Sequence, residues 1–193
     1  VNAFADKKKT VALYYSKSSN LYNRVNYKPA LTGVYEKLLM DGIRCGFVSE
    51  DKPEDFDKYD TIVIPAVTNT TANAFAKLKE WKANGGNVIF VGDGCLAKNE
   101  YNKAVSDTIS GTTVTYDTLS EQFNIRYYAV NPDGTKADNV SVEDVLYNGE
   151  TYFNICNYSD TDSKTVYLTD DGAILENYYD LISETWQARS ITL

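Results

Sequence analysis

TIVIP, at Thr61–Pro65, and NVIFV, at Asn87–Val91, are the two stretches of sequence that decide the fold. Each is a short, uninterrupted apolar run, as expected for a strand that helices cover on both faces. Between them, Phe75, Leu78 and Trp81 recur on one face of a helical pattern, and a glycine pair ends that pattern just before the second run. The order strand, helix, strand predicts a βαβ unit in a mostly parallel sheet.

The same alternation extends toward the N-terminus, where apolar runs predict two further strands at residues 10–15 and 43–48. The helix between these strands is predicted to start near Pro29. It is indicated by apolar residues at helical spacing and a glycine suited to a left-handed cap: Leu31, Val34, Tyr35, Leu38, Leu39 and Gly42. We expect a third helix at residues 100–109, and a loop with at most one helical turn at residues 51–59. This order predicts the α/β class, with a flavodoxin-like or amidotransferase-like parallel sheet sandwich.

After about residue 111 the helical period disappears, and short strands separated by turn residues follow. Asn148-Gly149 joins predicted strands at residues 140–147 and 151–157, and this dipeptide tolerates the positive φ angles of a type I′ turn. Further strands are expected at residues 125–130, 164–168, 173–176 and 190–193. We therefore predict an amidotransferase-like α/β domain at residues 1–120 and a small antiparallel β-sandwich domain at residues 121–193. Because Met40 is the only methionine and Leu193 falls inside an apolar strand pattern, we expect a piece of a longer protein, truncated at its C-terminus.

Composition excludes several classes of function. The 193 residues carry a formal net charge of −8, so the chain lacks the basic surface that binds the phosphates of nucleic acids. Its apolar runs are shorter than the roughly 20 residues of a membrane-spanning helix, and we expect no membrane partner. The sequence contains no histidine, which rules out Ser-His-Asp, Cys-His and His-zinc chemistry within the chain. Its three cysteines lie in or beside apolar runs and suit buried thiols.

Several longer stretches carry a resemblance to a known family. They are VALYYS (11–16), LTGVYEKLLMDGI (31–43), YDTIVIPA (59–66), LKEWKANGGNVIF (78–90), YNGETYFNICNYS (147–159), TVYL (165–168) and the segment from YDLIS to ITL (179–193). In this order and spacing they resemble the region that follows the catalytic barrel in family 42 β-galactosidases, namely the β-galactosidase trimerisation domain and the small β-sandwich after it.

The resemblance implies a non-catalytic part of a larger bacterial glycoside hydrolase. The two catalytic glutamates would lie on a preceding barrel, and this chain would hold no catalytic, cofactor-binding or metal-binding residue. Its partners would be that barrel and neighbouring subunits, with a role in subunit assembly and in the architecture of the active site. Loops at the carboxyl ends of the strands, including Tyr15, Ser16 and Tyr22, would be the interface candidates. Whether the parent enzyme is cytoplasmic or exported stays open.

Three features point to other functions. Cys95, in VGDGCLA after the fourth predicted strand, stands where class I amidotransferases carry a nucleophilic cysteine, but no histidine can activate it, and we expect it to be a packing residue. The YYSKSSN segment (14–20) follows the first strand, where flavodoxins hold the phosphate of FMN, although it lacks glycine. The 16 tyrosines and 2 tryptophans could stack on sugars. A carbohydrate-binding module is therefore the second interpretation, and a flavodoxin-type small-molecule binder the third.

Overall fold

The computed structural model describes residues 3–193, so the predicted start of the first domain at residues 1–2 lies outside the described residues. The chain forms two compact units. The sheet unit comprises Lys8–Leu38 and Arg44–Gln122. The β unit comprises Phe123–Leu193 together with Leu39–Ile43 and the residues up to Lys7. Among the described residues, no helix is both long enough and apolar enough to cross a membrane.

The sheet unit is built on five parallel strands in the order β2-β1-β3-β5-β7. Their bounds are β1 Val11–Tyr15, β2 Cys45–Ser49, β3 Thr61–Pro65, β5 Asn87–Val91 and β7 Thr112–Val114. Counted along the chain this is the order 2-1-3-4-5, which is that of flavodoxin-like sheets. The parallel sandwich predicted from the sequence is confirmed, and its first four strands lie where their apolar runs predict them.

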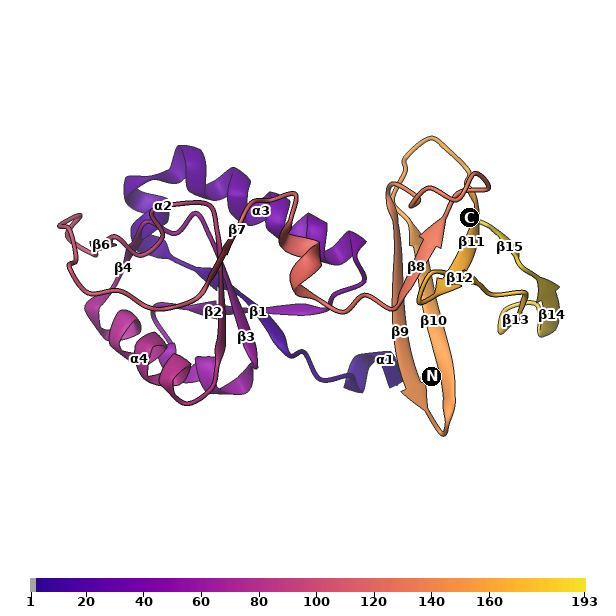
Figure 1. The fold of residues 1–193 in the computed structure, drawn as a ribbon, viewed down its shortest axis with the longest axis horizontal. Helices are drawn as coiled ribbons and strands as arrows, with labels where there is room; N and C mark the ends of the chain where they lie inside the picture. The colour runs from indigo at the N-terminus through magenta and orange to yellow at the C-terminus, as the bar shows by residue number, and fades with distance from the viewer. Residues whose placement is uncertain (1–2) are drawn as a thin grey trace. The chain divides into compact units, whose positions relative to one another are not determined.

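Helices cover both faces of this sheet, with α3 on one side and α4 on the other (Figure 1). The helical segments are α2 Lys17–Tyr22, α3 Arg24–Met40, α4 Ala72–Ala83 and the 3₁₀ turns η1 Pro53–Lys58 and η2 Leu119–Gln122. The threonine run before α4 caps it as expected, since the Thr71 hydroxyl accepts a hydrogen bond from the Ala74 amide at 3.2 Å. The core between the layers includes fully buried Phe56, Ile62 and Leu78.

The predicted start of α3 near Pro29 is wrong, because the helix begins at Arg24 and contains that proline. The Asn23 carbonyl accepts the amides of Asn26 and Tyr27, at 3.1 and 2.9 Å, and so forms the first turn before Pro29 is reached. α2 was not predicted, because its sequence KSSNLY carries no apolar period.

The predicted helix at residues 100–109 is also wrong, because these residues form turns and extended loop. The Asn99 side chain accepts hydrogen bonds from the amides of Tyr101 and Lys103, both at 3.0 Å, and this local bonding competes with helix formation. The Val105 amide donates a hydrogen bond to the Ala97 carbonyl at 2.9 Å, which ties the two ends of this loop together. Two short segments, β4 Asn69–Thr70 and β6 Lys98–Asn99, pair in parallel beside this loop.

The β unit consists mainly of antiparallel strands. Their bounds are β8 Tyr127–Val130, β9 Val140–Tyr147, β10 Glu150–Asn157, β11 Thr165–Asp170, β12 Ala173–Ile174, β13 Asn177–Asp180, β14 Thr185–Ala188 and β15 Ser190–Thr192, with a short helix α1 Ala3–Asp6. β9 and β10 form the predicted hairpin, and Asn148 and Gly149 adopt φ angles of 52° and 85°, as a type I′ turn requires. β11 pairs with β8, β12 and β15. The hydrophobic core of the β unit includes Val140, Val166 and Leu168.

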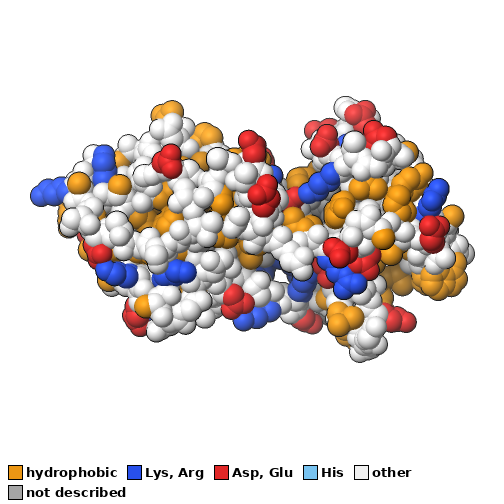
Figure 2. All heavy atoms as spheres, in the orientation of Figure 1, with side chains coloured by type: hydrophobic (Ala, Val, Ile, Leu, Met, Phe, Trp, Pro, Cys, Tyr) orange, Lys and Arg blue, Asp and Glu red, His pale blue; other side chains and the backbone are white. Residues whose placement is uncertain are grey.

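Gly42 adopts the left-handed conformation predicted for a helix cap, with a φ of 70°. A Cβ atom there would lie 1.9 Å from the Val142 carbonyl oxygen, a close approach that was not predicted, so only glycine fits this turn. The hairpin β13–β14 was not predicted either. It pairs Tyr179 with Trp186, whose rings meet edge to face at 5.7 Å. Trp186 is 71% exposed, and hydrophobic side chains gather on the surface at this hairpin (Figure 2).

Candidate functional site

Polar residues converge where β1, β2 and β3 end. Ser16 follows β1, Glu50 follows β2, and Asn69 follows β3, and their exposed fractions are 0%, 4% and 1%. In a parallel sheet of this strand order, ligands bind at the carboxyl edge where the strand order reverses, which here is between β1 and β3. This edge is therefore the first candidate site.

The carboxylate of Glu50 is the centre of this cluster. It accepts hydrogen bonds from the Ser18 amide at 2.7 Å, the Ser18 hydroxyl at 3.0 Å and the Thr71 amide at 3.1 Å. The Ser16 hydroxyl lies 3.4 Å away. A buried carboxylate is tolerated only when donors surround it, and these donors come from two separate helix starts, those of α2 and α4.

The serines of α2 also bind the start of β4. The Ser16 hydroxyl donates to the Asn69 carbonyl at 2.7 Å and accepts from the Ser19 amide at 2.8 Å, which makes it the N-cap of α2. The Ser19 hydroxyl donates to the same carbonyl at 2.9 Å and accepts from the Asn69 amide at 2.8 Å. These reciprocal bonds fix α2 against the segment that follows β3.

Two buried tyrosines complete the network. The Tyr27 hydroxyl accepts from the Ser16 amide at 2.8 Å, and the Tyr14 hydroxyl bonds to that of Thr70. Burial raises the pKa of Tyr14, with the nearby Glu50 charge adding to the effect, and burial likewise raises the pKa of Tyr27. Both phenols are therefore neutral at physiological pH, and they serve as hydrogen-bonding groups inside the core.

The network fills the place where a related fold would hold a ligand. The Ser18 amide, which the YYSKSSN segment would offer to the phosphate of FMN, is bonded to Glu50. An external anion would have to displace that carboxylate and leave it buried without its donors, which costs several kcal/mol. This arrangement argues against a flavodoxin-type phosphate site.

The three interface candidates have different surroundings. Ser16 is fully buried, and Tyr15 is half-buried with its ring 6.3 Å from that of Tyr27. Tyr22 is 46% exposed and lies beside two more exposed apolar residues, Leu21 at 74% and Val25 at 85%. We call Leu21, Tyr22 and Val25 the α2–α3 patch. Of the three candidates, only Tyr22 presents a large part of its side chain to solvent.

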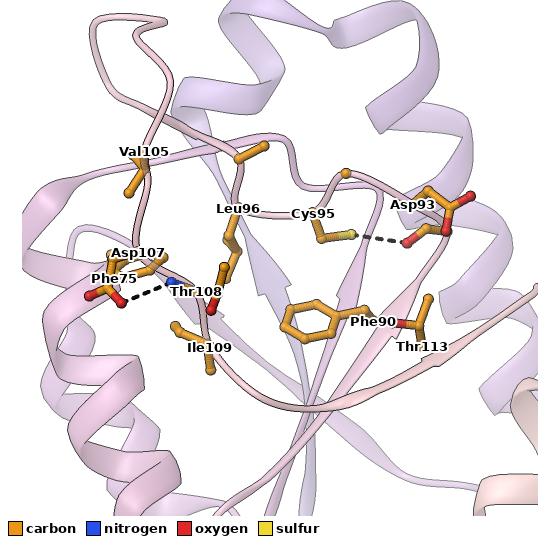
Figure 3. Close-up of a pocket in the computed structure, with 13 residues that line it drawn as sticks. Phe75, Phe90, Asp93, Cys95, Leu96, Val105, Asp107, Thr108, Ile109 and Thr113 are labelled. Atoms are coloured by element: carbon orange, nitrogen blue, oxygen red, sulfur yellow. Dashed lines mark hydrogen bonds between the residues drawn. The ribbon is translucent and has the colours of Figure 1, made fainter.

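Cys95 lies at the other end of the same sheet edge, in the loop after β5 and in the wall of a cavity (Figure 3). Its Sγ donates to the carbonyls of Gly92 and Ile64, at 3.5 and 3.6 Å. Burial raises the pKa of the Cys95 thiol to about 11. A thiol that stays protonated at neutral pH is a poor nucleophile, so the geometry favours the packing role over catalysis.

Sequence reasoning missed Glu50 and Asn69, the two residues on which the network depends. A signal was available, because Glu50 follows a predicted strand directly and the serine-rich and threonine-rich segments follow two others. Such segments meet at one edge of a parallel sheet.

Known proteins share the fold of this chain. The model of the β-galactosidase trimerisation domain family matches residues 6–181. Among solved structures, apo exo-carrageenase GH42 from Bacteroides ovatus has a TM-score of 0.81 at 16% identity over 99% of this chain and 28% of its own. A β-galactosidase from Bacillus circulans sp. alkalophilus has a TM-score of 0.61 at 14% identity over 96% of this chain and 40% of its own.

At these identities the solved structures establish the fold, and this chain spans well under half the length of either. A comparison with curated proteins finds no match. The family model, in contrast, covers most of the chain. The chain therefore belongs to the β-galactosidase trimerisation domain family.

Proposed function

We propose that the chain is a non-catalytic module of a larger family 42 glycoside hydrolase, in which it supports subunit assembly and borders the active site. Its partners would be a preceding catalytic barrel and neighbouring subunits. In this proposal a trimerisation-type domain spans residues 1–120 and a small β-sandwich domain spans residues 121–193. The observation that carries the proposal is the filled sheet edge around Glu50, which lies beside the exposed α2–α3 patch.

The filled edge supports a surface function over a chemical one. The Glu50 carboxylate accepts from the Ser18 and Thr71 amides, and the Ser16 hydroxyl donates to the Asn69 carbonyl, so these polar groups are occupied within the protein. The chain has no histidine, and burial keeps the Cys95 thiol protonated. These features disfavour acid–base and nucleophilic catalysis by this chain.

The α2–α3 patch supports an interface. Leu21 and Val25 expose 74% and 85% of their surface, and Tyr22 adds an aromatic ring of the type enriched at protein interfaces. Burying two such aliphatic side chains releases about 1.5–3 kcal/mol each. The hydrogen bonds of Ser16 and Ser19 fix α2, which bears Leu21 and Tyr22 of the patch, so binding would lose little conformational entropy there.

A charge placed in the patch tests this interface. In the full-length protein, Leu21→Asp combined with Val25→Asp should shift the assembly to smaller species in size-exclusion chromatography with light scattering, because a buried unpaired carboxylate opposes association. Tyr101→Asp is the matched control, since Tyr101 is 71% exposed in the same unit but lies outside the patch. An assembly that the double variant leaves intact at low protein concentration would contradict the proposed interface.

A carbohydrate-binding function is the second candidate. The observation that favours it is the cavity beside Cys95, whose lining combines aromatic rings with a carboxylate and hydroxyl groups.

A further inference from the structure

The cavity lies in the sheet unit and has a volume of about 290 Å³. The residues after β5, the α4 helix, the loop at residues 104–111 and β7 enclose it. Figure 3 shows the Phe90 ring between Thr113 on one side and the Thr108 to Ile109 segment on the other.

The floor and walls of the cavity are apolar. Phe75 and Phe90 are each 9% exposed, so their rings are nearly covered by protein but still reach the cavity surface. Leu96, Val105 and Ile109 complete this lining. A ligand seated here would place one apolar face against aromatic and aliphatic carbons.

The rim is polar and has free hydrogen-bonding capacity. Within residues 3–193, no hydrogen bond or ion pair engages the Asp93 carboxylate or the hydroxyls of Thr108 and Thr113. Gly92 and Gly94 both have positive φ, and a Cβ atom added to either would meet nothing within 4 Å, so the space above this loop is open.

The charge at the rim selects among ligands. Lys79 binds both oxygens of Asp107, at 2.7 and 2.6 Å, and its charge is thereby compensated. Asp93 then leaves the rim negative, which disfavours sulfated, phosphorylated or carboxylated ligands. A purely apolar side chain from a partner protein would desolvate Asp93 and the two hydroxyls without returning their hydrogen bonds.

We propose that this cavity is a binding site for a single neutral pyranose residue. A pyranose has one face of C–H groups that can lie on the Phe90 ring, and an edge of hydroxyls that can donate to Asp93 and exchange hydrogen bonds with Thr108 and Thr113. The cavity is small for a ligand site, which suits one sugar ring and not an oligosaccharide. The cavity lining shares no residue with the α2–α3 patch, so the two proposals can be tested separately.

The test is an NMR titration of the full chain with methyl β-galactopyranoside. The amide signals of Gly92 and Gly94 should shift and saturate at millimolar sugar. Thr113→Trp, which fills the cavity, should weaken binding by at least about tenfold, which is about 1.4 kcal/mol. Thr112→Trp is the matched control, because Thr112 is the preceding exposed residue of β7 but does not line the cavity, and it should bind as the wild type does.

Two further arms complete the experiment. Asp93→Asn should weaken binding of the neutral sugar without changing the fold, and galactose 6-sulfate should bind severalfold more weakly than the neutral sugar at low salt. The proposal is overturned if the wild type shows no saturable shift, or if Thr113→Trp and Thr112→Trp bind equally well. Saturation by cyclohexane-type probes with no response to the sugar would instead identify an apolar docking pocket, and would also overturn it.

Discussion

The polar groups at the two ends of one sheet edge differ in their burial and in their hydrogen bonding. At the β1–β3 end, Glu50, Ser16 and Asn69 are buried, and the Ser16 hydroxyl lies within hydrogen-bond distance of both the Glu50 carboxylate and the Asn69 carbonyl. At the β5–β7 end, Asp93 and the hydroxyls of Thr108 and Thr113 lie around an apolar cavity, and no hydrogen bond from the described part of the chain engages them. We call the first the closed end and the second the open end. Parallel strands end at both, and the difference comes from the loops that follow them, because only the loops at the closed end supply both a carboxylate and the groups that donate to it.

The largest effect is expected from Glu50→Ala at the closed end. The substitution leaves the Ser18 and Thr71 amides buried without their acceptor, and should lower the free energy of unfolding by about 3 kcal/mol. Urea denaturation measures this loss. Glu54→Ala, which removes an exposed carboxylate from η1, should change stability by less than about 0.5 kcal/mol.

Chemical rescue sharpens this prediction. If the Glu50 carboxylate satisfies those donors, formate added to the Glu50→Ala variant should restore part of the lost stability, while the wild type should respond only weakly. Equal stability of the Glu50→Ala and Glu54→Ala variants would mean that the closed end does not depend on its internal anion.

The next largest effect concerns Cys95 at the open end. Because burial raises the pKa of the Cys95 thiol to about 11, it should react with iodoacetamide about tenfold more slowly than free cysteine at pH 8, since only the thiolate attacks and its higher nucleophilicity offsets part of its lower population. Mass spectrometry of the alkylated peptide follows the rate. A rate equal to or above that of free cysteine would revive the nucleophile interpretation.

A smaller effect is expected from Tyr14→Phe at the closed end. Loss of the hydroxyl leaves Thr70, which is 2% exposed, without this partner and should cost about 1 kcal/mol. Because burial raises the Tyr14 pKa in the folded state, the unfolded phenol ionises first. Stability should therefore be fully present below about pH 10 and decline as the pH rises further. The alkaline decline should be shallower in the variant, and unfolding curves recorded at several pH values would reveal an unchanged slope if this is wrong.

The smallest effect is expected from Lys79→Met at the open end. The Lys79–Asp107 pair is exposed, with side chains 51% and 53% accessible, and exposed pairs contribute little to stability. Thermal melting should show no resolvable change, whereas the pKa of Asp107, which the hydrogen bond from Lys79 lowers, should rise toward its ordinary value in an NMR pH titration. A large drop in melting temperature would show that this pair holds the loop.

The strands of the sheet were readable from the sequence because a buried parallel strand requires an uninterrupted apolar run, as in Thr61–Pro65. The β9–β10 turn was readable because Asn148-Gly149 suits the required φ angles. The helix predicted at residues 100–109 is absent, and Val105 and Ile109 of that segment line a cavity. β7 was not predicted, because it has only three residues and one buried side chain.

The site was harder to predict than the fold. Glu50 contacts Ser16 and Thr71, which lie 34 and 21 positions away along the chain, so no local motif contains the network. The family resemblance named Tyr15, Ser16 and Tyr22 as interface candidates, and that role stays a prediction. Only packing distinguishes the buried Ser16 from the exposed Tyr22 six residues later.

The two tryptophans of the chain give each unit its own optical reporter. Trp81 in α4 is 5% exposed and belongs to the sheet unit, whereas Trp186 in β14 is 71% exposed and belongs to the β unit. Emission from the first should be blue-shifted and shielded from acrylamide, and emission from the second red-shifted and readily quenched. Variants carrying Trp81→Phe or Trp186→Phe would therefore let a fluorometer follow the unfolding of each unit separately, and coincident transitions would show that the two units melt as one cooperative block.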